Sequence, residues 1–186
     1  MARRIDTQAV IDSIRLEDQV SDPSNTDAGY HSIFVKSDGL YVESPTGSVV
    51  GLNFTEWESY NTVWEGSSSN PSIGNGTLYS AWRRTGIKSV EFRIFLRIGS
   101  STNEGNGTWT WTLPTVITGS AYTFDAGNAF ALDAGTAWYN GACIIGYGDS
   151  NKVAVILGAQ SLVGQGSPIT WANDDLLVVR GSYVEP

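Results

Sequence analysis

Residues that commonly carry out catalysis are sparse in this sequence. It contains one histidine, His31, and one cysteine, Cys143. A Ser-His-Asp triad or a Cys-His pair needs a histidine beside a nucleophile, and no such arrangement stands out around His31. A metal site with two histidine ligands cannot be built from a single histidine. We therefore predict a protein without enzymatic activity, bound metal or cofactor.

The remaining reactive groups have structural interpretations. Cys143 lies in an apolar run, which favours a buried thiol that packs as a small hydrophobic group. Asp174 and Asp175 could be a fragment of a calcium loop, but a polar turn before the last strand is the favoured interpretation. Glycine-rich residues 74–76 and 105–107 lack the lysine and the strand-to-helix context of a phosphate-binding loop. Carboxylate pairs for glycoside hydrolysis depend on three-dimensional spacing, and no strand segment here places two at adjacent inward positions.

Aromatic and basic residues are more prominent. Most of the seven tryptophans lie in strand-like patterns, where large aromatics usually belong to the core or to a subunit interface. Stacking against sugars is the alternative role for some of them: Trp57, Trp64, Trp82, Trp109, Trp111, Trp138 and Trp171. Five of the eleven cations fall within fifteen residues, namely Arg83, Arg84, Lys88, Arg93 and Arg97. They form either a basic patch for an acidic partner or an outer sheet face with cross-strand ion pairs.

These side chains must be positioned by a fold rich in turns. Of the 186 residues, 41% are hydrophobic, only 16% are charged and 21 are glycine, which favours antiparallel β-structure over a helix bundle. The net charge of −8 argues against nucleic acid or an anionic membrane as the main partner. No apolar run is long enough for a transmembrane helix, and the charged N-terminus lacks a secretion signal, so we expect synthesis in a cytoplasm.

Charge and turn signals divide the chain into three predicted segments. Residues 1–25 hold eight charged side chains and apolar residues without a clear period, which indicates an arm that docks on another surface; a frayed tail is the alternative. Residues 26–58 show turn signals at residues 37–39 and 44–47, which predict a small β-meander that must pack on a neighbour. Residues 59–186 are predicted to form an antiparallel β-sandwich or jelly roll.

Alternation of apolar and polar residues locates strands in the third segment. In residues 89–99 the apolar side chains fall on one face, and Phe95 is the one apolar residue on the wetter face. Residues 109–113 alternate in the same way and stop at Pro114. Further strands are expected near residues 129–139, 142–148, 152–157 and 176–183. The predicted fold class is therefore all-β.

Three stretches resemble a module found in virion proteins of tailed bacteriophages. Residues 28–42, followed by Gly47 and Val49, resemble the AGY…Y-K-x-DG-LY…G meander of tail-fibre and tail-tip proteins. Residues 64–86 and 99–114 are similar to the pattern NPxxGNGT…Y-RR-xG…GSTT-xGxG-x-W-x-F-x-LP. Residues 168–183 are similar to the ending P-x-TWA-x-GD…G-x-Y, with Asn173-Asp174-Asp175 where a Gly-Asp is common. The resemblance covers everything except the arm and implies a β-sandwich or jelly roll that often forms homotrimers.

The resemblance does not determine where on the phage particle the protein is located, but other features of the sequence favour one location. A receptor-binding fibre normally needs a long shaft, and this sequence has neither heptads nor repeats. We therefore predict a trimeric head decoration (cement) protein in the phage particle, with further copies and the major capsid protein or another virion protein as partners. An adhesion module of a tail fibre, tail tip or head fibre that binds host-cell glycan is the alternative. Candidate interface residues are Ile5, Val10, Ile14, Leu16, Tyr30, Phe34, Tyr41, Arg83, Arg84 and Phe95.

Overall fold

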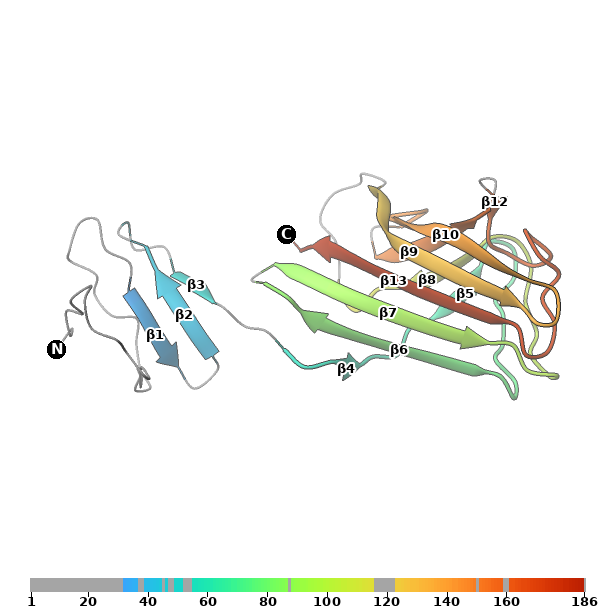
Figure 1. The fold of residues 1–186 in the computed structure, drawn as a ribbon, viewed down its shortest axis with the longest axis horizontal. Helices are drawn as coiled ribbons and strands as arrows, with labels where there is room; N and C mark the ends of the chain where they lie inside the picture. The colour runs from blue at the N-terminus through green and yellow to red at the C-terminus, as the bar shows by residue number, and fades with distance from the viewer. Residues whose placement is uncertain are drawn as a thin grey trace. The chain divides into compact units, whose positions relative to one another are not determined.

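A computed structural model describes residues 32–36, 39–44, 46, 49–51, 55–86, 88–115, 123–149, 151–158 and 161–185. The chain divides into two compact units, residues 1–53 and residues 54–186. Each unit is built on a sheet of its own (Figure 1). The predicted arm, residues 1–25, lies outside the described residues, as does His31.

The first unit contains a three-stranded antiparallel sheet in the order β1-β2-β3. Its strands are β1 (Ser32–Lys36), β2 (Gly39–Glu43) and β3 (Val49–Gly51). Lys36 pairs with Gly39, so two residues separate the first two strands, which is the spacing of a tight hairpin. The meander predicted from the two turn signals is thereby confirmed.

The second unit is one ten-stranded antiparallel sheet that curls on itself. The strand order is β4-β6-β7-β13-β9-β10-β11-β8-β5, and β12 also pairs with β11. In Figure 1, β6, β7, β13 and β9 form one layer, and β8 and β5 lie behind it. The bounds are β4 (Glu58–Ser59), β5 (Trp64–Gly66), β6 (Thr77–Arg84), β7 (Ser89–Arg97), β8 (Trp109–Thr112), β9 (Thr123–Asp133), β10 (Ala137–Ile145), β11 (Lys152–Leu157), β12 (Ser161–Leu162) and β13 (Leu176–Val184).

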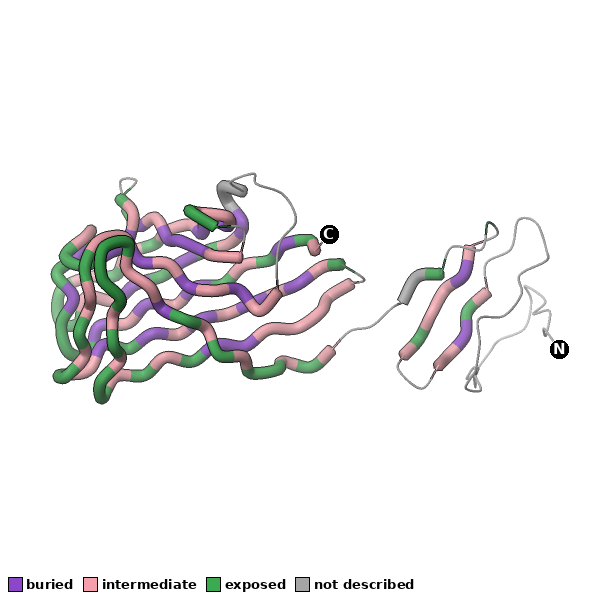
Figure 2. Tube along the Cα trace, turned by 180° about the vertical axis from the view of Figure 1, so that it is seen from behind, coloured by how far each residue is buried: buried purple, intermediate pink, exposed green. Residues whose placement is uncertain are grey.

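The hydrophobic core fills the space between the two halves of the curled sheet. The strand β7 shows how the sequence produces it, because its apolar residues other than Phe95 recur at every second position and therefore point to one face. All of them are buried: Val90, Phe92, Ile94 and Leu96. Burial alternates in a similar way along β13, whereas β10 and β11 contain runs of three consecutive buried residues; Figure 2 shows the buried positions along the strands of this unit.

Tryptophans supply the largest fully buried side chains of the core. Trp109 of β8 is fully buried and meets Trp64 of β5 edge to face, with ring centroids 4.7 Å apart. The ring of Trp171, in the turn before β13, lies 5.1 Å from Trp109. Edge-to-face and tilted contacts are favourable because the positive ring edge meets the negative face of its neighbour. The interpretation of most tryptophans as core residues is therefore confirmed for this group.

Some predicted strand boundaries were wrong. Residues 129–139 do not form one strand, because β9 ends at Asp133 and β10 begins at Ala137. Between them the Thr136 N–H donates to the Asp133 carbonyl at 2.9 Å, and Gly135 has φ of +81°. Glycine adopts a positive φ without steric cost, so Gly135 favours a turn between the two strands. The alternation of apolar and polar residues around it obscured this turn signal in the sequence. The strand expected at residues 142–148 begins earlier and is the second half of β10.

The all-β, antiparallel class is confirmed, with a β-sandwich-like second unit. A single continuous sheet supplies both layers, because β9, β10 and β11 lie between β13 and β8 in the strand order and connect one layer to the other. The strands β6 and β5 were not predicted from alternation. The described residues include no helix long and apolar enough to span a membrane.

Candidate interaction surfaces

The stretches that resemble the second and third virion motifs meet at one end of the sandwich. Asn75 lies in the turn before β6, and its Oδ1 accepts hydrogen bonds from the N–H and the hydroxyl of Ser101, at 2.8 and 2.9 Å. The Ile98 N–H donates to the Asp175 carbonyl at 2.9 Å, which ties the end of β7 to the turn before β13. Trp109 and Trp171, which belong to different motifs, pack together in the core. The motif residues at this end therefore hold loops together.

Glycines are needed in this region because backbones approach closely. A Cβ on Gly99 would lie 2.5 Å from the backbone nitrogen of Gly76, and one on Gly76 would lie 2.5 Å from the Arg97 carbonyl oxygen. Such distances are far inside van der Waals contact, so larger residues would push the loops apart. The glycine-rich stretch 74–76 that resembled a weak phosphate loop thus serves loop packing.

Asp174 and Asp175 form a structural turn, as the favoured interpretation predicted. Asp175 is only 1% exposed, and its two carboxylate oxygens accept the N–H groups of Ala134 and Ala172, at 2.8 and 2.7 Å. Asp174 has φ of +73°, in the left-handed region that aspartate tolerates better than most residues. In the resembling pattern a glycine stands at this position, so Asp174 keeps the turn in spite of the changed residue type.

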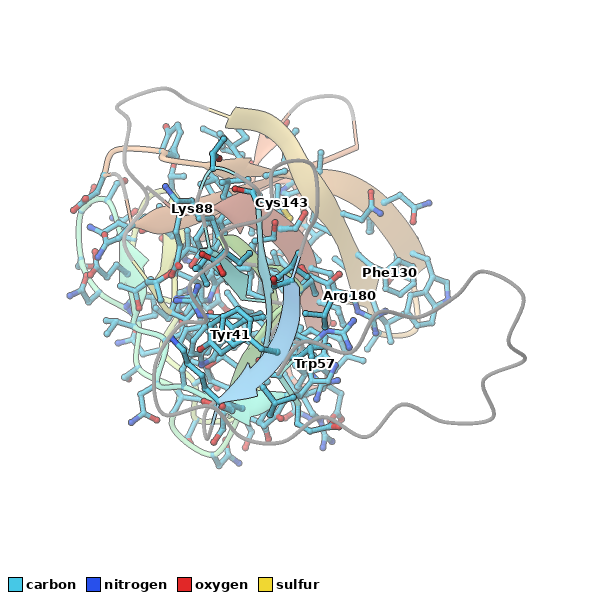
Figure 3. The ribbon with its side chains drawn as sticks, turned by 90° about the vertical axis from the view of Figure 1, so that its left-hand side faces the viewer. Tyr41, Trp57, Lys88, Phe130, Cys143 and Arg180 are labelled. Carbon is cyan, nitrogen blue, oxygen red and sulfur yellow. The ribbon has the colours of Figure 1, made fainter. Side chains whose placement is uncertain are left out.

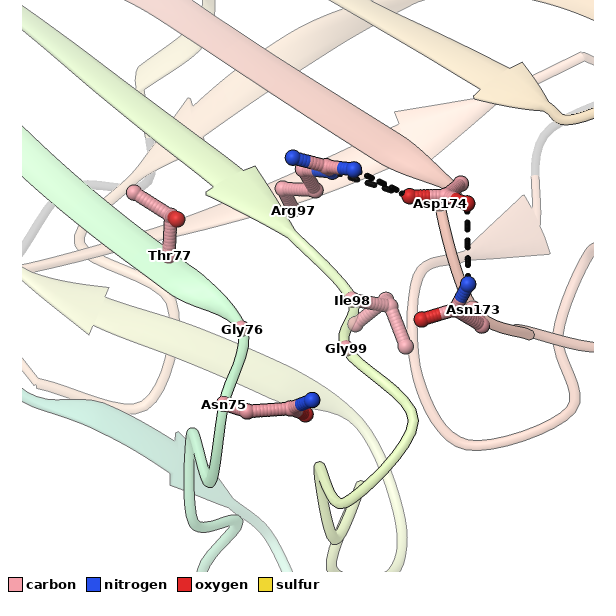
Figure 4. A pocket seen from close by; sticks show the side chains of 8 residues that line it. All are labelled: Asn75, Gly76, Thr77, Arg97, Ile98, Gly99, Asn173 and Asp174. Atoms are coloured by element: carbon pink, nitrogen blue, oxygen red, sulfur yellow. Dashed lines mark hydrogen bonds and ion pairs between the residues drawn. The ribbon is translucent and has the colours of Figure 1, made fainter.

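A polar cleft of about 230 Å³ opens beside this turn (Figure 4). Asn75, Thr77, Arg97, Asn173 and Asp174 contribute its polar side chains. Its one guanidinium is already neutralised, because Arg97 forms an ion pair with Asp174. The described residues hold no group of three or more His, Cys, Asp or Glu side chains that could bind a metal ion. The cleft therefore offers hydrogen bonds but no free charge, and we assign no chemistry to it.

The outer face of the sandwich carries an unexpected apolar stripe. Strand register places Tyr79 of β6 beside Phe95 of β7, Phe95 beside Val178 of β13, and Val178 beside Phe130 of β9. Paired residues share a face of the sheet, so all four point outward. Leu176, Leu132 and Trp138 form the next row on the same face. Phe95, the apolar residue that broke the alternation of β7, is thus the centre of a continuous surface.

This outer stripe is exposed enough to be an interaction surface. Tyr79, Phe130 and Trp138 are 44%, 37% and 59% exposed. Aromatic side chains bury 150–250 Å² each when covered, so these three present roughly 300 Å² of aromatic surface. That is comparable with the largest apolar patch of a typical monomer, which is often functional.

Most arginines of the basic cluster have partners within the chain. Three of them form ion pairs, Arg83 with Glu91, Arg84 with Glu185 and Arg97 with Asp174. The Arg93 guanidinium lies 4.5 Å from the Trp57 ring centroid, as expected for a cation–π contact. Arg180 of β13 is exposed and has no ion-pair partner among the residues described. Of these three ion pairs, only Arg83–Glu91 joins direct cross-strand partners, and Arg180, which is not part of the cluster, is left available.

Beside Arg180 the outer face is hollowed. A shallow hollow of about 340 Å³ is lined by Asn128, Ala129 and Phe130 of β9 and by Val178 and Arg180 of β13. Figure 3 shows Phe130 and Arg180 close together on the same side of the sandwich as Trp57. Trp138 of β10 stacks on Phe130, with ring centroids 4.6 Å apart and planes 24° from parallel.

The small sheet of the first unit also exposes apolar side chains. Ile33 pairs with Val42 and Val35 pairs with Leu40, so these four aliphatic residues share one face. Ile33 is 58% and Leu40 is 36% exposed. The opposite face carries Phe34, which is buried and stacked on Tyr41 with ring centroids 5.5 Å apart. We call the first of these the aliphatic face.

The predicted interface residues are therefore distributed over several places. Ile5, Val10, Ile14, Leu16 and Tyr30 lie outside the described residues. Phe34 and Tyr41 stack on the face opposite the aliphatic face, Arg83 and Arg84 are engaged in ion pairs, and Phe95 is in the outer stripe. Sequence reasoning missed Ile33 and Leu40, although their positions two residues from Val35 and Val42 were a signal for a shared face. It also missed the alignment of Phe130 and Trp138 with Phe95, which only strand register reveals.

Comparison of the chain with protein-family models, with curated proteins and with solved structures found no match. Function must therefore be argued from the residues and their geometry.

Proposed function

We propose that this chain is a structural protein of a bacteriophage particle, a capsid decoration (cement) protein that binds to the head shell through its first unit. The observation that carries the proposal is the aliphatic face of the small sheet, where Ile33 and Leu40 stay exposed although they stand among apolar neighbours. The resemblance of three stretches to virion proteins supports the class of particle, and the aliphatic face supports the mode of attachment.

The physical argument starts from the size of the small sheet. Three short strands cannot form a two-sided core, so one face of such a sheet needs a partner to be covered. Covering Ile33 and Leu40 contributes about 1 kcal/mol each, since burying a whole aliphatic side chain contributes roughly 1.5–3 kcal/mol. Contacts of that strength give stable binding through avidity when they are repeated at many symmetric sites, or within the homotrimer that the resemblance implies. The sandwich is then anchored to the shell through the first unit.

The test is binding to phage heads that lack the protein. We expect the purified chain to cosediment with such heads and to raise the temperature at which they release DNA. Replacing both Ile33 and Leu40 by Ser should weaken binding by about tenfold or more, because roughly 2 kcal/mol of apolar burial is lost per copy. Val184→Ser is the matched control, since Val184 is 63% exposed in the second unit. Failure of the wild-type chain to bind, or equal weakening by the control, would refute the proposal.

A second candidate is an adhesion module of a tail fibre, tail tip or head fibre. The exposed stacked pair Phe130 and Trp138 favours it, because aromatic surfaces of this kind bind sugars. Electron microscopy of particles carrying labelled protein separates the two candidates. Label on the shell faces supports decoration, and label at the tail supports adhesion.

A further inference from the structure

We propose that the hollow between β13 and β9, together with Trp138, binds a pyranose ring that carries a carboxylate, as found in acidic surface glycans. The inference goes beyond attachment to a particle and requires only that the sandwich be accessible. It combines an aromatic platform, unengaged amides and a free guanidinium that the strand register brings together.

The platform is the stacked pair of Phe130 and Trp138. Their near-parallel rings, 24° apart, present a broad apolar surface of which 37% and 59% is exposed. The C–H groups on one side of a pyranose carry partial positive charge and pack well on the negative face of an aromatic ring. Neither ring is needed in the core, because both point to the outer side of the sheet.

Two amides stand next to the platform. Asn128 lies two residues before Phe130 on β9, and Asn140 is the direct cross-strand partner of Phe130 on β10. Both are exposed, and neither side chain is hydrogen-bonded to another described residue. An amide offers two donors and an acceptor, which suits hydroxyl groups that both donate and accept.

Arg180 supplies the preference for an acid. It is the cross-strand partner of Asn128 and lines the hollow, and no carboxylate among the described residues neutralises it. In contrast, Arg83, Arg84 and Arg97 each face an acidic partner. A guanidinium matches a carboxylate through two parallel N–H···O bonds, whereas a neutral sugar leaves that geometry unused.

A protein partner fits this hollow less well. The strands β13, β9 and β10 are all interior to the sheet, so no open strand edge is available for an added strand. Two copies packed face to face would also place Arg180 of each copy in the contact, and no carboxylate among the described residues of the same copy neutralises it. A hollow of about 340 Å³ lies at the low end of the range for small-ligand sites.

The experiment uses the full chain and three probes: a hyaluronan tetrasaccharide, which contains glucuronate, 3′-sialyllactose, and lactose as the neutral control. Isothermal titration calorimetry should show at least one acidic probe binding tenfold or more tighter than lactose. Trp138→Ala should weaken binding of that probe at least tenfold. Arg180→Gln should reduce its affinity to that of lactose, while lactose binding stays unchanged. Both residues are exposed, so the variants should melt as the wild type does.

Tyr79→Ala is the matched control, because Tyr79 is an exposed aromatic at the far end of the same stripe. It should leave affinity for the acidic probe unchanged. Absence of binding to both acidic probes, or binding that Trp138→Ala and Arg180→Gln leave intact, would overturn the inference. So would loss of head binding or of self-association in these two variants, because the surface would then be a protein contact. The proposed function is tested separately, through Ile33 and Leu40.

Discussion

Replacing Asp175 by Asn should destabilise the sandwich although the change is nearly isosteric. Asp175 accepts hydrogen bonds through both carboxylate oxygens, from the N–H of Ala134 in the β9–β10 turn and from the N–H of Ala172 before β13. It therefore joins two turns that are distant in sequence. An Asn side chain has only one acceptor oxygen, so one buried N–H would face an NH₂ group instead.

The expected cost follows from that loss. A hydrogen bond to a charged group contributes about 1.5–3 kcal/mol, and a buried donor left unsatisfied costs about 1–3 kcal/mol. Because these two figures describe overlapping losses, and because Asn does not bury a charge, we expect about 2–3 kcal/mol for Asp175→Asn. For a unit of this size, each kcal/mol lowers Tm by roughly 3–5 °C, so the expected decrease is about 10 °C.

Urea and thermal unfolding followed by tryptophan fluorescence will measure the change, since Trp109 and Trp171 pack beside the turn. Asp174→Asn is the control. It keeps a residue that tolerates the φ of +73° and alters only exposed contacts, the ion pair with Arg97 and the hydrogen bond from the Asn173 amide, so it should cost at most about 1 kcal/mol. Equal stability of wild type and Asp175→Asn would refute the reasoning. A large rise in the Tm of the wild type with Ca²⁺ would also refute it, because the aspartates would then hold a cation.

Three further predictions concern the second unit. Gly141→Ala should lower the free energy of unfolding by more than about 3 kcal/mol, because its Cβ would lie 1.9 Å from the Ile156 carbonyl oxygen. Gly135→Ala is the control: Gly135 has φ of +81° and no atom within 4 Å of the added Cβ, so the change should cost about 1 kcal/mol in the same denaturation assay. Burial acts to raise the pKa of the Glu185 carboxyl, but hydrogen bonds from Arg84 and Thr115 outweigh it and hold that pKa below 4.5. Glu185 thus stabilises the fold above pH 4.5 and loses this contribution as the pH falls through its lowered pKa. Glu185→Gln should therefore lose less stability in acid than the wild type does, and an identical dependence of stability on pH in the two proteins would contradict this. The Cys143 thiol, fully buried, should react with Ellman's reagent only as fast as the sandwich unfolds, and rapid labelling of the native protein would show that β10 opens locally.

The candidate surfaces show where sequence patterns stop being informative. Alternation in β7 identified Phe95 as an outward apolar residue, but one strand cannot show what lies beside it. The neighbours of Phe95 are Tyr79 and Val178, which are 16 and 83 positions away in the chain and come together only through strand register. The same holds for Arg180 and Asn128 in the hollow. The arm, by contrast, lies outside the described residues, so its docking stays a prediction.

The sequence by itself determined the all-β class, the meander and the alternating strands, because side chains of a strand point to opposite faces with a period of two and turns select particular residues. It also indicated that Cys143 and most tryptophans are buried. Only the tertiary structure decided that β13 lies between β7 and β9, and therefore which outward residues adjoin one another. Pairing between distant strands depends on the total burial of the folded sheet, which no local pattern encodes.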